Sequence, residues 1–180
     1  MQGHSKDDAT IQIVRIAAWM WIIYLAALIL IDRFIIAARH FVLIYYLDHL
    51  LIALVFLGLA YWSWVQRVLK KTFIPLMIAW LSAFPIVLNH FLVPRLRVGP
   101  LSSIEGLTLR LLPVLFIALI LTAWSYRWKQ VLLFSLATAV LDLLILQLLG
   151  RDRLVPVYPS YVVVMVRTIS FLVVGYFITR

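Results

Sequence analysis

A small set of ionisable side chains interrupts the apolar stretches of this sequence, and these residues could carry chemistry. They are Asp48, His49, His90, Arg110, Asp142 and Arg167. A charge in hydrocarbon is costly, so such groups are usually paired with one another and usually functional. Arginine can form two parallel hydrogen bonds to a carboxylate or to an anionic ligand. The residue types therefore indicate ion pairs between helices, or a site for a polar ligand.

Other kinds of site receive less support from the sequence. His49 and His90 are of the type that could ligate a haem or a metal ion, but buried histidines are more often hydrogen-bonded structural residues, and we predict no cofactor and no metal. His49, next to Asp48, could instead titrate as a pH switch. The sequence has no cysteine and no HExxH, GxSxG or Walker A pattern, and we predict that the chain is not an enzyme.

Six apolar stretches must position these residues. Of the 180 residues, 66% are hydrophobic, against about 45–50% in soluble domains, and a membrane-spanning helix needs about 20 apolar residues. The predicted spans are 12–32, 41–64, 72–93, 106–125, 130–149 and 159–179. Short connections favour antiparallel hairpins. The predicted fold is an all-α polytopic membrane protein, with a short cytoplasmic segment 1–11 and a six-helix transmembrane domain 12–180.

The flanking residues suggest an orientation. With six spans both termini share one side, and the turns 65–71 and 126–129 face that side. All four lysines lie there: Lys6, Lys70, Lys71 and Lys129. We therefore predict cytoplasmic termini. The net charge of +9 is attributed to topology signals and lipid headgroup contacts, and no nucleic-acid partner is expected.

In this orientation the ionisable residues occupy one layer of the outer half of the membrane. Asp48, Arg110, Asp142 and Arg167 lie roughly 6–12 Å below the outer boundary. Adding neighbours of the same layer or its edge, the candidate site is Asp48, His49, Asn89, His90, Glu105, Arg110, Asp142 and Arg167. Three interpretations stay open: ion pairs that only fix helix packing, a pocket for a small-molecule or lipid ligand, and an Arg110 side chain that merely reaches the headgroups.

The last span suggests a family. The string RTISFLVVGYFITR at 167–180, with VRIAAWMW at 14–21 and NHFLVPR at 89–95, resembles the six-helix membrane input domain of bacterial sensor histidine kinases. The resemblance implies a homodimer in the bacterial cytoplasmic membrane, with the last span continuing into phosphoacceptor and ATPase domains. This sequence contains neither domain, so it looks truncated after the span and no kinase residue is carried over.

Two functions are therefore expected for the chain. The first is a membrane-embedded sensory and signal-transducing domain without the catalytic part of the kinase. The alternative is a small six-helix substrate-binding subunit of a membrane transporter, which the scarcity of glycine and of small-residue helix interfaces disfavours.

Overall fold

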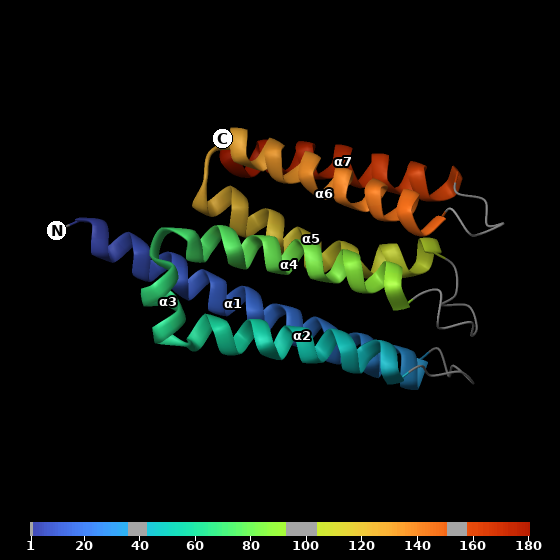
Figure 1. Cartoon of the computed structure of the whole chain (residues 1–180), viewed down its shortest axis with the longest axis horizontal. Coiled ribbons are helices and arrows are strands. Elements are labelled where there is room, and N and C mark those ends of the chain that lie inside the picture. The colour runs from blue at the N-terminus through green and yellow to red at the C-terminus, as the bar shows by residue number, and fades with distance from the viewer. Residues whose placement is uncertain (1, 36–42, 93–103, 151–157) are drawn as a thin grey trace. The chain divides into compact units, whose positions relative to one another are not determined.

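Every regular element that the structure describes is a helix (Figure 1). The computed structural model describes residues 2–35, 43–92, 104–150 and 158–180. The α-helices are α1 (Gln2–Leu30), α2 (Leu43–Tyr61), α3 (Ser63–Leu69), α4 (Phe73–Leu92), α5 (Ile104–Ser125), α6 (Trp128–Gly150) and α7 (Tyr158–Thr179). A π-helical turn, η1 (Ile31–Ile35), extends α1, and a 3₁₀ turn, η2 (Lys70–Thr72), joins α3 to α4.

The prediction of an all-α chain is confirmed for the described residues, and each predicted span overlaps a helix, although Trp62 interrupts the second span. Four helical stretches of the described residues are long and apolar enough to cross a membrane: Ala9–Phe34, Ser63–His90, Trp128–Leu148 and Tyr161–Thr179. The apolar parts of the two remaining helices, Tyr46–Tyr61 and Arg110–Ser125, are shorter. The chain is thus compatible with a membrane-embedded protein, and the six-span bundle stays a prediction.

Two segments differ from their predicted form. Residues 2–11, predicted as a separate N-terminal segment, are the first turns of α1. Residues 65–71, predicted as a turn, form most of α3 and the start of η2. Trp62 ends α2 because its backbone is extended (φ −79°, ψ 100°), and the described side chains of α3 include none that is buried.

The chain forms two compact units, Met1–Leu81 and Ser82–Arg180, here called the N-terminal and C-terminal units. In the N-terminal unit α1 packs against α2. The buried residues of α2 recur every three or four positions, which is the period of one helix face: Tyr46, His49, Ala53, Phe56 and Ala60. Trp21 of α1 meets Phe56 edge to face, with ring centroids 5.9 Å apart.

In the C-terminal unit α5, α6 and α7 pack against one another. Phe171 of α7 is fully buried between the other two helices, with its ring centroid 5.1 Å from that of Phe116 and 6.2 Å from that of Phe134. One turn later, a Cβ atom on Gly175 would collide with the Val131 side chain of α6. The two helices can therefore approach closely at this position because Gly175 carries no side chain.

Candidate functional site

Asp142, Arg167 and His90 form a buried cluster that joins three helices of the C-terminal unit. Arg167 on α7 donates from Nη1 to Oδ2 of Asp142 on α6, at 2.6 Å. The Nε2 atom of His90, on α4, lies 3.1 Å from the other carboxylate oxygen, Oδ1. Each oxygen of Asp142 thus has its own cationic or N–H partner. We call these three residues the charge cluster.

The helical repeat explains why these side chains meet. Positions four apart lie on one helix face, and on α6 Thr138 and Asp142 are both buried. Arg167 hydrogen-bonds to both of these residues, because its Nη2 donates to the backbone carbonyl of Thr138 at 3.3 Å. On α7, Arg167 and Phe171 are likewise four apart and buried, and the Arg167 guanidinium carbon lies 6.0 Å from the Phe171 ring centroid. Arg167 is therefore fixed from three directions.

Burial makes the pairing energetically decisive. Asp142 and Arg167 are each 2% exposed, so neither charge retains its hydration. A buried ion pair contributes little net stability because desolvation offsets the attraction, whereas removing one partner costs about 3–5 kcal/mol. The cluster is thus a poor source of stability and a strong constraint on how the helices pack.

His90 connects α4 to the pair through a ring whose two nitrogens both face oxygen acceptors. Nδ1 lies 2.9 Å from the Ile86 carbonyl of its own helix, and Nε2 faces Asp142. A neutral imidazole carries one N–H and the imidazolium carries two. Only the doubly protonated ring can donate to both oxygens at once, and the cluster then contains two cations and one anion.

Hydrogen-bonding capacity remains in and beside the cluster. Among the described residues, the Nε–H of Arg167 has no hydrogen-bond acceptor and the Oδ1 atom of Asn89 has no hydrogen-bond donor. Asn89 precedes His90 on α4 and is 2% exposed. A buried polar atom without a partner costs about 1–3 kcal/mol. One donor and one acceptor can therefore gain energy from a different arrangement of helices or from a polar ligand.

The remaining predicted site residues occupy other places. Arg110 is half-buried on α5, in the same unit as the charge cluster. The side chain of Glu105, also on α5, lies outside the described part of the chain. Asp48 and His49 lie on α2 of the N-terminal unit, where His49 is buried and Asp48 half-buried. The predicted eight-residue layer thus yields one described cluster of three, with Asn89 adjacent in sequence.

Sequence reasoning missed two residues. Asp32, predicted to end the first span, is buried within the π-helical turn η1. The apolar Phe34 and Ile35 that follow it indicate that the helix continues. Gly175 was not recognised as a contact residue, although it is a lone glycine inside an apolar helix. Among the described residues, no group of three or more His, Asp or Glu side chains is arranged to hold a metal ion.

Comparison of the chain with protein-family models, with curated proteins and with solved structures gives no match. The geometry of the charge cluster is therefore the basis for a functional proposal.

Proposed function

We propose that this chain is a membrane-embedded sensory and signal-transducing domain, similar to the six-helix input domains of bacterial sensor histidine kinases. It would cross the bacterial cytoplasmic membrane six times, with both termini in the cytoplasm, and would act as a homodimer. The observation that supports this proposal is the buried charge cluster. It joins α4, α6 and α7 through side chains that are costly to separate.

Such a cluster can act as a two-state element. A stimulus shifts an equilibrium between two helix packings only if it interacts unequally with them. Inverting a two-state equilibrium from 1:99 to 99:1 takes about 5.5 kcal/mol, and removing one partner of a buried pair costs about 3–5 kcal/mol. A stimulus that competes for Asp142 or Arg167 can therefore supply most of the free energy that such an inversion needs. The Nε–H of Arg167, which has no acceptor among the described residues, offers the stimulus a hydrogen-bond donor.

The position of Arg167 suits it to pass on such a change. It lies twelve positions before Thr179, the last residue of α7, which corresponds to about 18 Å of continuous helix. Rotation or sliding of α7 at Arg167 would be carried to the end of the helix because an α-helix is stiff over this length. The cytoplasmic end of α7 is then the output of the domain.

The experiment uses the protein encoded by the complete native reading frame, reconstituted in liposomes with ATP. We expect autophosphorylation on histidine, and we expect Asp142→Asn and Arg167→Leu each to change its rate about tenfold or more, the equivalent of 1.4 kcal/mol. The control is Met165→Leu, at a 64% exposed position of the same helix. A reading frame without an effector domain, or wild-type rates in both variants, contradicts the proposal.

The alternative is a substrate-binding subunit of a transporter, and one observation favours it. In the N-terminal unit, where α1 packs against α2, the small residues Ala17, Ala18, Ala53 and Ala60 are buried. Small residues at a helix interface let the two backbones approach closely. Substrate accumulation in liposomes that contain the chain and its energising partners, without phosphoryl transfer, would favour transport.

A further inference from the structure

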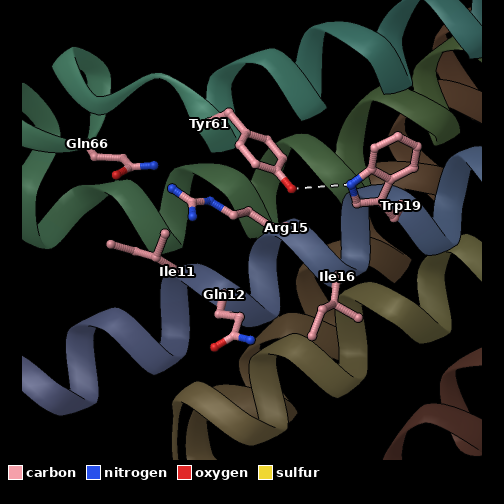
Figure 2. Close-up of a pocket in the computed structure, with 7 residues that line it drawn as sticks. All are labelled: Ile11, Gln12, Arg15, Ile16, Trp19, Tyr61 and Gln66. Carbon is pink, nitrogen blue, oxygen red and sulfur yellow. Dashed lines mark hydrogen bonds between the residues drawn. The ribbon is translucent and has the colours of Figure 1, made fainter.

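The N-terminal unit contains a pocket that is independent of the charge cluster (Figure 2). It has a volume of about 570 Å³, within the range of about 300–1,000 Å³ typical of small-molecule sites. Its lining comes from α1 and from the junction of α2 and α3: Ile11, Gln12, Arg15, Ile16, Trp19, Tyr61 and Gln66. Arg15 is the only charged residue among the lining residues that the structure describes.

Arg15 is held in place through the end of α2. The last carbonyls of a helix lack intrahelical donors, and the Ala60 carbonyl accepts hydrogen bonds from Arg15 Nε at 3.2 Å and from Gln66 Nε2 at 2.7 Å. The guanidinium carbon also lies 4.6 Å from the Tyr61 ring centroid, a cation–π contact. No described residue accepts a hydrogen bond from the two terminal nitrogens of Arg15. These contacts position the two terminal nitrogens of Arg15, and no described residue occupies them.

The residues around the pocket are those of a membrane–water interface. Trp19 donates from Nε1 to the Tyr61 hydroxyl at 3.3 Å, as the dashed line in Figure 2 marks. Trp62 and Trp64, just beyond, are both 57% exposed, and the exposed basic residues Arg67, Lys70 and Lys71 follow. Exposed tryptophan beside basic residues at the end of an apolar helix is typical of the lipid headgroup layer.

The length of the first candidate span agrees with this depth. Ala9–Phe34 contains 26 residues, about 39 Å of helix, whereas the hydrocarbon core is about 30 Å thick. An upright span of this length would extend beyond the hydrocarbon core into the headgroup layers. Arg15 and the aromatic residues beside it lie near its N-terminal end.

We propose that this pocket binds the phosphate group of an anionic phospholipid. Arginine matches phosphate oxygens with two parallel hydrogen bonds, and the Gln12 and Gln66 amides can donate further bonds to the headgroup. The apolar Ile11 and Ile16 would contact its glycerol and upper acyl carbons. The site goes beyond the proposed sensory function, because all of its residues lie in the N-terminal unit.

The test measures binding to the full chain in a neutral detergent. The probes are dioleoylphosphatidylglycerol, dioleoylglycerol, which lacks the phosphate, and inorganic phosphate, which lacks the lipid. Binding is read by native mass spectrometry and by the rise in unfolding temperature, which a ligand specific for the folded state produces. We expect saturable binding of phosphatidylglycerol and at least about tenfold weaker binding of the other two probes.

Matched variants distinguish the pocket from general electrostatic attraction. Arg15→Gln should weaken phosphatidylglycerol binding about tenfold. Arg67→Gln removes the same charge nearby, where Arg67 Nε bonds only the Ser63 carbonyl of its own helix, and should change binding less than about twofold. Ile16→Trp fills the pocket without removing a hydrogen bond and should also block binding, so the test does not depend on Arg15→Gln folding.

Four results would overturn the proposal. Equal binding of dioleoylglycerol would exclude phosphate recognition, and equal binding of inorganic phosphate would exclude a lipid as the source. Wild-type phosphatidylglycerol binding in Ile16→Trp, or equal losses in Arg15→Gln and Arg67→Gln, would show that the pocket is not the site.

Discussion

Removing either member of the Asp142–Arg167 pair should destabilise the C-terminal unit, and the structure predicts which removal costs more. Arg167→Met leaves a buried carboxylate that keeps one partner, because His90 Nε2 remains 3.1 Å from Oδ1. Asp142→Asn leaves Arg167 without its only described carboxylate, and the one remaining amide oxygen can serve only one of the two donors, Arg167 and His90. Both belong to the class of broken buried pairs, which cost about 3–5 kcal/mol. We place Arg167→Met near the lower end and Asp142→Asn near the upper end.

The double variant Asp142→Leu/Arg167→Met separates pairing from packing. Replacing a whole buried pair by apolar side chains of similar size is often neutral or stabilising. The double variant also removes the carboxylate partner of His90 Nε2, which costs about 1–3 kcal/mol. We therefore expect the double variant to be destabilised by about 1–3 kcal/mol and to be more stable than either single variant. In the double variant the Thr138 carbonyl also loses the hydrogen bond from Arg167 Nη2, at 3.3 Å. Because this bond is long, its loss adds only a small cost in stability.

The assay is reversible unfolding of the purified chain in mixed micelles, followed by far-ultraviolet circular dichroism while the denaturing detergent is increased. Met165→Leu is the control for an exposed substitution on α7. Single variants within 1 kcal/mol of the wild type would refute the proposed energetic role of the pair. A double variant as unstable as the worse single variant would show that the side chains matter through shape and not through charge pairing.

Three further outcomes follow from the packing. Gly175→Ala should destabilise the chain by about 1–3 kcal/mol, because the new Cβ collides with Val131. Gly58→Ala should stabilise it by up to about 1 kcal/mol, because nothing lies within 4 Å of the new Cβ. The same unfolding assay compares the two variants, and equal effects would contradict the close approach of α6 and α7. Phe171→Ala should cost about 3–5 kcal/mol, because its ring contacts both Phe116 and Phe134; a loss below 1 kcal/mol would mean that Phe171 is not central to the unit. Because the chain has no cysteine, Lys129→Cys and Ser160→Cys can be labelled in intact cells with a membrane-impermeant maleimide; we expect labelling of Ser160→Cys alone, and labelling of both or of Lys129→Cys alone would contradict the proposed topology.

The positions of the helices could be predicted from the sequence because apolar stretches of about 20 residues are a strong signal for membrane-spanning helices. The break between α2 and α3 could not be predicted, since Trp62 is neither glycine nor proline and no local sequence signal ends the helix there. The π-helical turn that buries Asp32 has no recognisable sequence signal either. It changes the rotation of the chain beyond Leu30, and with it the face on which Asp32 lies.

The charge cluster was only partly within reach of the sequence. The residue types and the similar depths of Asp142 and Arg167 in the membrane suggested that the two could pair. The depth of a residue does not determine how its helix is rotated about its own axis, and this rotation is what brings His90 to the pair as the third member of the charge cluster. For the same reason the role of Gly175 depends on Val131, a residue of another helix, and could not be read from α7 alone.

The claim that the charge cluster holds α7 in one of two packings can be tested most directly by pulsed electron–electron distance measurement. Spin labels are placed at Leu136 on α6 and Val173 on α7, both about half exposed, in the cysteine-free chain reconstituted in liposomes. The wild type should give one dominant distance, and Asp142→Asn should shift a large part of the population to a second distance. An unchanged distance distribution in Asp142→Asn would contradict the claim.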